Sequence, residues 1–355
     1  MYLNDDWQIT DKSPFNDCYV MVEYKYWYEN ILLEDRTLNL VSHRAQLRLS
    51  LESLHRKNEH AFQVKLCFLR AAFSKVCTGK MMFEIGAGGD GKGMEAYLDK
   101  NLLGSHQTTT LDCGVFLDRQ EFRKSGEFAW GKCNVRIQEM DSHGRFIADI
   151  WKRFVVDEEI DCRVNYGFTS KRKFGDSMKI QELNYENVPV IEEVRDRLKA
   201  CEHLKRRVVC LRMGKAKFVT DMDQVDHEKG IYKLLPQDEL IAFLSHPLTA
   251  SLYFRDWCLP FFSENTMDEC LQMIANLGLV HPDLVTDTEW LANRLSGASL
   301  PPPGAAGESL EDHAELIGKK TKKNRALPPP FFFVCVAHSV LLFFATGAGG
   351  GNKIQ

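Results

Sequence analysis

The chain has 355 residues and a formal net charge of −4, so it is long enough for two domains of ordinary size. This charge excludes a uniformly basic nucleic-acid-binding protein, and any contact with nucleic acid must come from a local basic patch. The 11 cysteines are scattered and form neither a zinc-binding pattern nor a disulfide framework, so we expect reduced thiols in an intracellular compartment.

The N-terminal segment, residues 1–60, mixes aromatic and charged side chains without a clean period. We expect it to be a fragment of a preceding domain, with a strand over residues 20–28. Its start is polar and acidic and contains no signal peptide, which favours a protein of the nucleus or cytoplasm. Over residues 61–76 apolar side chains recur at helical spacing, and this predicts a helix.

A glycine-rich loop with one lysine follows a short apolar strand and precedes a helix. Within the stretch FEIGAGGDGKGM, residues 86–92 fit the spacing G-x-x-x-x-G-K, which ends at Lys92. Glycine backbone N–H groups can turn inward on an anion, and the following helix N-terminus favours negative charge. We therefore predict a phosphate-binding site with Lys92 on the outer phosphates; its members are Gly86, Gly88, Gly89, Asp90, Gly91, Lys92 and Gly93. A glycine-rich turn in a linker is the alternative.

Gly93 departs from this pattern, because Ser or Thr normally supplies a hydroxyl to Mg²⁺ at that position. Either a water replaces the hydroxyl, or the site binds nucleotide and turns it over slowly. We therefore predict nucleotide binding more firmly than vigorous hydrolysis.

Residues 131–141 predict a strand that ends in acidic residues. A carboxylate at the C-terminal end of a buried strand can hold Mg²⁺ and orient water in a nucleotide hydrolase. Glu139 is the first candidate for this metal site and Asp141 the second. A surface strand followed by a helix N-cap at Asp141 explains the same residues equally well.

A basic hairpin is predicted over residues 165–180, after a helix and a strand within residues 152–163. Lys171, Arg172 and Lys173 lie at or near its tip. In an acidic chain such a cluster is a local anion site, and the phosphate backbone of DNA is the obvious anion. A solvated turn is the alternative.

The next strand, within residues 178–189, ends at Asn184 and is stopped by Pro189. The Asn184 amide is placed to hold a water or a γ-phosphate oxygen. A helix over residues 191–204 precedes Arg206 and Arg207, which serve either a neighbouring subunit's phosphate or a salt bridge.

The C-terminal part divides into three predicted regions. Residues 216–295 are predicted to form a helical domain, residues 296–330 a Pro- and Lys-rich linker, and residues 331–355 an apolar, glycine-rich tail. Within the tail, residues 331–346 carry no charged side chain but are short for a bilayer span of about 20 residues. A membrane anchor and an aberrant C-terminal sequence are therefore the two alternatives for this segment.

The order of these motifs resembles that of the superfamily 3 helicases, the AAA+-type motors of viruses, phages and plasmids. The chain looks most like the helicase part of viral and plasmid primase-helicases, and the resemblance covers about residues 60–260. It implies an α/β fold: a P-loop AAA+-like core with a central parallel sheet over residues 61–215, then a smaller helical domain and a disordered tail.

The resemblance also implies roles for the candidate residues. Lys92 would bind the phosphates of ATP, Glu139 and Asp141 would handle Mg²⁺ and water, and Asn184 would be the polar sensor. Arg206 or Arg207 would be the arginine finger of a homo-hexameric ring. The hairpin would be a pore loop that grips the DNA backbone without reading its sequence.

These expectations converge on an ATP-dependent DNA helicase or translocase. A degenerate nucleotide-binding remnant and a monomeric P-loop kinase for a small molecule are the alternatives. The motor hypothesis depends on Lys92 and Glu139 meeting at the tops of neighbouring strands, with Asn184 beside them.

Overall fold

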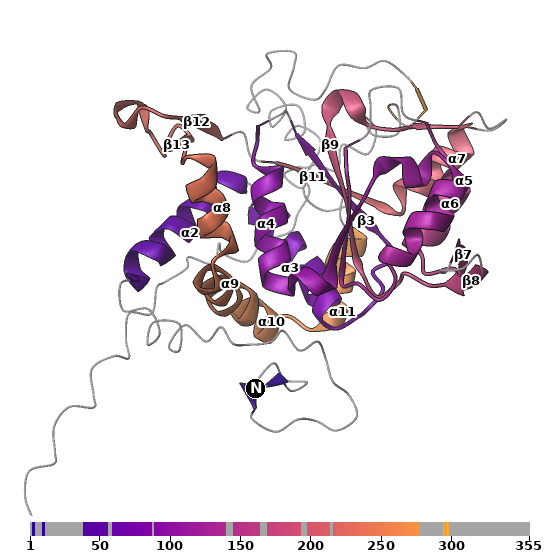
Figure 1. Cartoon of the computed structure of the whole chain (residues 1–355), viewed down its shortest axis with the longest axis horizontal. Helices are drawn as coiled ribbons and strands as arrows, with labels where there is room; N and C mark the ends of the chain where they lie inside the picture. The colour runs from indigo at the N-terminus through magenta and orange to yellow at the C-terminus, as the bar shows by residue number, and fades with distance from the viewer. Residues whose placement is uncertain are drawn as a thin grey trace, which may run out of the picture. The chain divides into compact units, whose positions relative to one another are not determined.

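A parallel sheet of five strands lies at the centre of the structure, which is a computed structural model (Figure 1). In order across the sheet the strands are β11 (Val208–Arg212), β3 (Met81–Gly86), β9 (Met178–Asn184), β5 (Asn134–Ile137) and β4 (Thr108–Leu111). All neighbouring pairs are parallel, so the carboxyl ends of the strands meet along one edge. The expected α/β class with a central parallel sheet is confirmed.

The structure describes residues 2–3, 9–10, 38–55, 59–86, 89–139, 145–163, 169–192, 197–213, 216–276, 294 and 296–297. Asp141, Gly88, the strand expected at residues 20–28 and almost all of the linker and tail lie outside these residues.

The strand order corrects one expectation about the site. Strand β9 lies between β3 and β5, so the strands that precede Lys92 and Glu139 are not neighbours. Gly86 at the end of β3 is paired with Asn184 at the end of β9. Strand β9, which ends at Asn184, therefore lies between β3, which leads to Lys92, and β5, which leads to Glu139. Parallel strands are joined by crossover connections, so a strand can pair with strands that are distant in the sequence, and local sequence does not encode this choice.

Helices cover both faces of the sheet (Figure 1). One face packs against α3 (Glu59–Phe73) and α4 (Lys92–Leu103). The other packs against α5 (Arg119–Ser125), α6 (Ala148–Val155) and α7 (Arg197–Lys205). Strand β3 is buried along its whole length, as expected for a central parallel strand between two helical layers.

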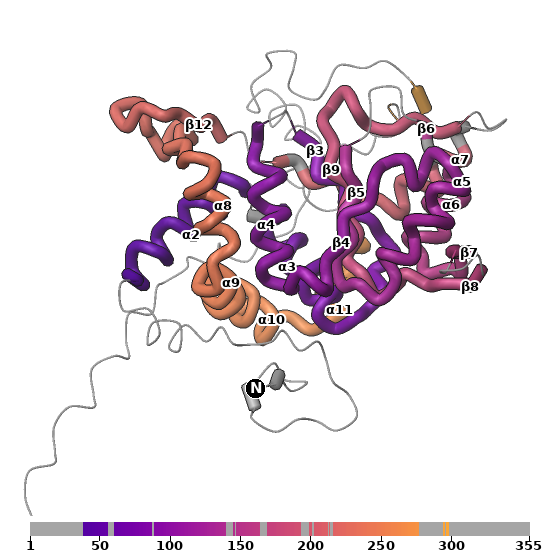
Figure 2. Tube along the Cα trace, in the orientation of Figure 1, coloured from indigo at the N-terminus to yellow at the C-terminus, as the bar shows by residue number. Residues whose placement is uncertain are grey.

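The first helical layer extends to elements from both ends of the described chain. Helix α2 (Leu40–Leu54) lies beside α9 (Pro247–Tyr253) in Figure 2, and their leucines share one core with α3 and α4. Other helices of this layer are α8 (Gln237–Ser245), α10 (Leu259–Glu264) and α11 (Met267–Asn276), with a π-helical turn at Phe254–Cys258. The division into an N-terminal segment, a core and a helical domain stays a prediction.

The wholly helical pattern expected over residues 216–295 is wrong in its first part. Strands β12 (Lys217–Val219) and β13 (Ile231–Lys233) form a parallel pair there. Strands of three residues are too short to show an alternating pattern, which explains why the sequence did not reveal them. Helix α2 was missed as well, because it mixes apolar and charged residues with little periodicity.

The basic hairpin is also placed differently from the expectation. Its strands are β7 (Ile160–Arg163) and β8 (Thr169–Arg172), whereas residues 178–184 belong to the central sheet. Lys171 and Arg172 therefore lie on a strand and not at the tip. Ile160 and Cys162 alternate inward from β7 and are buried, and this inward face fixes the register of the hairpin.

The remaining elements are short. Strands β1 (Tyr2–Leu3) and β2 (Ile9–Thr10) pair antiparallel, and β6 (Arg145–Phe146) pairs parallel with β10 (Val190–Ile191). The 3₁₀ turns cover Ser105–Gln107, Cys113–Phe116, Gly126–Phe128, Tyr185–Asn187 and Met222–Gln224. None of the helices in the described part of the chain is long and apolar enough to cross a membrane, and residues 331–346 lie outside that part.

Candidate functional site

The predicted P-loop joins the end of β3 to the start of α4. Gly86 is the last residue of β3, and α4 begins at Lys92 with Gly91 as its N-cap. Gly89 and Gly91 have φ angles of 80° and 98°, a region in which a side chain would be strained. The glycines thus allow the turn that brings the N-terminus of α4 to the carboxyl edge of the sheet, as the sequence pattern predicted.

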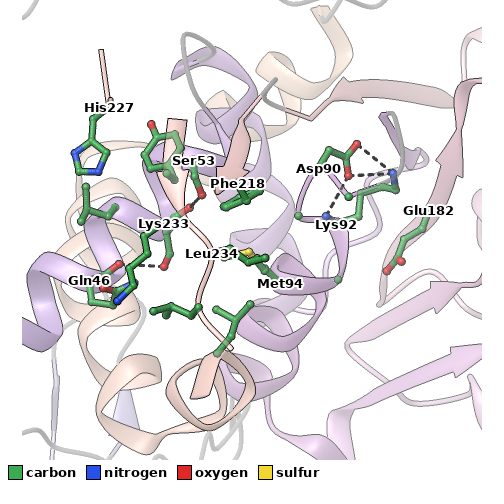
Figure 3. A pocket seen from close by; sticks show the side chains of 18 of the residues that line it. Gln46, Ser53, Asp90, Lys92, Met94, Glu182, Phe218, His227, Lys233 and Leu234 are labelled. Carbon is green, nitrogen blue, oxygen red and sulfur yellow. Dashed lines mark hydrogen bonds and ion pairs between the residues drawn. The ribbon is translucent and has the colours of Figure 1, made fainter. Parts of the chain in front are cut away.

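Lys92 and Asn184 meet at this edge. Lys92 Nζ lies 3.1 Å from Asn184 Oδ1. It also lies 3.1 Å from each carboxylate oxygen of Asp90 (Figure 3). The lysine is thus held between the loop and the end of β9, with only 10% of its side chain exposed.

Glu139 joins the same constellation through the end of β9. Its Oε1 accepts a hydrogen bond of 2.8 Å from the backbone N–H of Asn184 and one of 3.0 Å from Asn187 Nδ2. Among the described residues, both of these bonds are accepted by Oε1. The other carboxylate oxygen, Oε2, is therefore available to a cation or a water. The second predicted acid, Asp141, lies outside the described residues.

These residues line one end of a pocket with a volume of about 460 Å³. The other end is formed by α2 and by the β12–β13 region, which contribute Leu49, Ser53, Phe218, Tyr232 and Leu234 (Figure 3). The pocket volume is within the range of small-molecule sites. One end is therefore charged. The other end combines aromatic and leucine side chains with the polar residues Gln46, Ser53, His227 and Lys233.

A network of buried charges lies beneath the pocket and was not foreseen from the sequence. Lys65 Nζ lies 2.9 Å from Glu84 Oε1, 2.7 Å from Asp99 Oδ2 and 3.3 Å from Glu95 Oε1. Burial opposes the charged form of Lys65, but these carboxylates outweigh it and raise the pKa of its ammonium.

Arg136 connects this network to the pocket. Its guanidinium contacts Asp99 Oδ2 at 2.6 Å and Glu84 Oε2 at 3.1 Å, and it also binds Glu182. Glu182 lines the pocket two residues before Asn184, and its side chain is 25% exposed. At the other end of the network, His55 Nε2 lies 3.3 Å from Glu95 Oε1. The signals in the strand sequences were Glu84 in β3 and Arg136 in β5, each a charged residue between two apolar ones.

The residues fit a nucleotide with Mg²⁺ better than a metal held by protein alone. No group of three or more His, Cys, Asp or Glu side chains in the described residues could hold a metal ion by itself. Mg²⁺ in nucleotide sites is usually bound through one or two carboxylates together with phosphate oxygens and water. Glu139 can supply one such carboxylate, whereas Gly93 in the first turn of α4 supplies no side chain.

Arg206 and Arg207 lie at the opposite end of the sheet from the pocket. They immediately precede β11, where Val208 is paired with Met81 at the start of the P-loop strand. Arg207 Nη1 donates a 2.7 Å hydrogen bond to the carbonyl of His203, and Arg206 is exposed. Neither arginine belongs to the pocket of its own chain, so a role as an arginine finger is a prediction about a neighbouring chain.

The three basic residues of the hairpin differ in their surroundings. Arg172 donates hydrogen bonds of 2.8 and 3.1 Å to the Glu127 carboxylate and stacks over Trp130, 3.9 Å from the ring centre. Lys171 and Lys173 are exposed, and Lys171 has a weak ion pair of 3.5 Å with Glu159. Arg172 is therefore occupied within the chain, and the two lysines are the cations that remain accessible.

Two exposed aromatic residues beside the hairpin were also missed. Phe128 is 67% exposed and Trp130 is 48% exposed, in the segment just after α5. The signal was present in the sequence EFAWG, which places two aromatic residues around one alanine next to a glycine turn. Large exposed aromatic side chains of this kind often mark a binding surface.

Comparison with known proteins gives matches in structure only. The sequence matches no protein-family model and no curated protein. The chain is similar to the C-terminal region of NrS-1 in its apo A form, with a TM-score of 0.39 and 17% identity over 58% of this chain and 44% of that chain. It is also similar to the JCV helicase, with a TM-score of 0.40 and 13% identity over 76% of this chain and 71% of that chain. The chain thus spans less than half of the NrS-1 chain, and similarity at this level assigns no function.

Proposed function

We propose that this chain binds ATP with Mg²⁺ in the pocket and hydrolyses it as the motor of a ring-shaped DNA helicase or translocase. The observation that carries the proposal is the meeting of Lys92, Asn184 and Glu139 at the carboxyl edge of the parallel sheet. Three adjacent strands supply a phosphate-binding cation, a polar sensor and an acid to one pocket, which is the arrangement that phosphoryl transfer requires.

The charged end of the pocket suits the phosphates. Lys92 and the N–H groups at the start of α4 would hold the outer phosphates. Glu139 would hold Mg²⁺ through its free oxygen and orient the attacking water, while Asn184 fixes the position of Lys92. Mg²⁺ bound with the nucleotide would neutralise the charge that develops on the phosphates.

The end of the pocket at α2 and β12–β13 suits the base. Phe218, Tyr232 and Leu234 provide flat and apolar contacts, and the polar groups beside them are those of Gln46, Ser53, His227 and Lys233. Apolar walls with a few polar groups are the usual surroundings of a bound nucleotide base. The β12–β13 pair would therefore complete the nucleotide site, although its sequence suggested only helix.

The hairpin and its aromatic neighbours suit a single strand of DNA. Lys171 and Lys173 would contact the phosphate backbone. Bases would stack on Phe128 and on the face of Trp130 that Arg172 does not cover. Arg172 would act indirectly, because its pairing with Glu127 holds it against Trp130. Such a surface follows the backbone and the stacked bases and does not read the sequence.

A homo-hexameric ring would bring Arg206 or Arg207 to a neighbouring pocket. Both lie at the far end of the sheet from Lys92 in their own chain, so they can serve a phosphate only across an interface. An arginine supplied in this way stabilises the charge of the transition state and accelerates related hydrolases by about 10³–10⁵-fold.

The deciding experiment measures ATP turnover with and without single-stranded DNA at fixed salt. We expect DNA to stimulate turnover and Lys92→Ala to abolish it, while Lys100→Ala, an exposed lysine on the same helix, leaves it unchanged. Replacing Lys171 and Lys173 together by Ala should remove the stimulation and preserve basal turnover. Equal turnover by the Lys92→Ala and wild-type proteins would exclude the proposed site.

Gly93 favours one second candidate, a nucleotide-binding remnant without motor activity. The residue offers no hydroxyl to Mg²⁺ at the position where P-loop hydrolases normally have one. The same experiment separates the two: the remnant would bind ATP through Lys92 but show no turnover at any DNA concentration.

A further inference from the structure

We propose that Asp90 is a built-in competitor of the nucleotide phosphates, whose carboxylate occupies Lys92 until a nucleotide displaces it. The inference rests on the proposed nucleotide site and adds a control of its affinity. It assigns a role to a residue that the loop pattern G-x-x-x-x-G-K leaves unspecified.

The Asp90 carboxylate contacts both kinds of group with which the loop can bind a phosphate, an ammonium and a backbone N–H. Both of its oxygens lie 3.1 Å from Lys92 Nζ, and Oδ1 also accepts a hydrogen bond of 3.4 Å from the backbone N–H of Lys92. That N–H belongs to the first residue of α4, at the positive end of the helix dipole. A lysine ammonium and N–H groups at a helix N-terminus are the usual partners of a bound phosphate.

Asp90 is packed into the loop and does not project into solvent. A Cβ atom added to Gly86 would lie 1.4 Å from Asp90 Oδ2, so the carboxylate rests directly on the backbone of Gly86. The residue is 8% exposed, and it lines the pocket together with Lys92. Burial raises the pKa of Asp90, and the contacts with Lys92 offset this shift only in part.

A phosphate that binds Lys92 must therefore displace this carboxylate, because the carboxylate already occupies both the ammonium and the N–H at the start of α4. Displacement loses charge-assisted hydrogen bonds. This loss lowers the affinity for nucleotide relative to a loop without this charge. The effect requires Lys92, because the lysine is the group for which the two anions compete.

The test uses Asp90→Asn, which keeps the size of the side chain and removes its charge. The measurement is the dissociation constant of a fluorescent, non-hydrolysable ATP analogue, by anisotropy, at fixed salt and without divalent cations so that metal binding does not enter. We expect binding about tenfold tighter than in the wild type, the change that follows from removing one charge-assisted contact. In a Lys92→Ala background the same substitution should change the affinity less than twofold.

Glu182→Gln is the matched control, because Glu182 also lines the pocket but is paired with Arg136 and not with Lys92. Unchanged or weaker binding by folded Asp90→Asn overturns the inference, and so does an equal gain in Glu182→Gln. If Asp90→Asn does not fold, Asp90→Ser provides the same comparison with the same expected gain. Failure of the wild type, Asp90→Asn and Lys92→Ala proteins alike to bind the analogue would instead refute the nucleotide site itself.

Discussion

Both faces of the central sheet pack on apolar side chains, but they differ in the other groups that they bury. Beneath α3 and α4, Lys65 and Arg136 are buried together with Glu84, Glu95 and Asp99. Beneath α5 and α6, the sheet packs on a cluster of aromatic rings that includes Phe116, Phe122 and Phe154, with ring centres 5.5 to 6.2 Å apart. The pocket lies above the charged face.

This difference indicates separate tasks for the two faces. Aromatic packing contributes stability through buried apolar area and contacts between rings. A buried ion network is a weak source of stability, but it is sensitive to the loss of any one partner. Here it runs from Glu182 in the pocket, through Arg136 and Lys65, to His55 at the end of α2. We infer that the charged face fixes the positions of the pocket walls relative to one another.

Removing one partner from the charged face should give the largest effect. Arg136→Met removes the cation shared by Glu84, Asp99 and Glu182 and leaves Glu84 and Asp99 with Lys65 alone. We expect a loss of about 3–5 kcal/mol in the free energy of unfolding. Urea denaturation measures it. Arg123→Met is the control: Arg123 pairs with Asp161 at 3.8 Å, both about half exposed, and its loss should cost at most about 1 kcal/mol. Similar losses in the free energy of unfolding of the two variants would contradict the proposed difference between buried and surface charges.

The aromatic face also buries a cation, Lys179, and removing this cation should stabilise the protein instead of destabilising it. Lys179 is buried with its ammonium 5.5 Å from the centre of the Phe154 ring. Burial lowers the pKa of Lys179 from 10.5 to about 8, although Cys77, Asp157 and Asp176 oppose the shift. Between about pH 8 and 10.5 the unfolded chain binds this proton and the folded chain does not, so stability from this group rises with pH across that window. Below pH 8 the penalty is fully present.

Lys179→Met should therefore stabilise the protein at pH 7 by up to about 3 kcal/mol, the free energy that corresponds to the pKa shift. Thermal or urea unfolding of both proteins at several pH values measures it. The gain of the variant over the wild type should shrink between pH 8 and 10.5. A difference that does not depend on pH would show that the buried ammonium is not the cause.

The sequence predicted the parts of the site whose signals are local. The glycines around Lys92 lie between a short apolar run and a helix, and Asn184 ends a strand that Pro189 terminates. Each signal depends on residues a few positions apart, because turn geometry and strand termination are local properties. The same is true of Glu139 at the end of an apolar strand.

Properties that depend on distant pairing could not be predicted in this way. The insertion of β9 between β3 and β5 depends on which strands pair, and no local pattern records that choice. Glu84 and Arg136 each interrupt an apolar strand, but only the folded sheet shows that they share partners with Lys65. Likewise, the sequence places Asp90 in the loop without indicating whether its carboxylate faces solvent or folds back on Lys92.

Introducing a hydroxyl at residue 93, in the first turn of α4, should have the smallest effect of these substitutions, expressed as a free energy. A Cβ at Gly93 would meet no atom within 4 Å, and its φ is not in the left-handed region, so a side chain fits there. We expect Gly93→Ser to raise Mg²⁺-dependent ATP turnover about tenfold, about 1.4 kcal/mol, because its hydroxyl can complete the metal coordination. Gly93→Ala is the control for backbone and helix effects and should show no gain. Steady-state turnover over a range of Mg²⁺ concentrations measures both variants. An equal response of Ser and Ala would mean that the missing hydroxyl does not limit ATP turnover in this pocket.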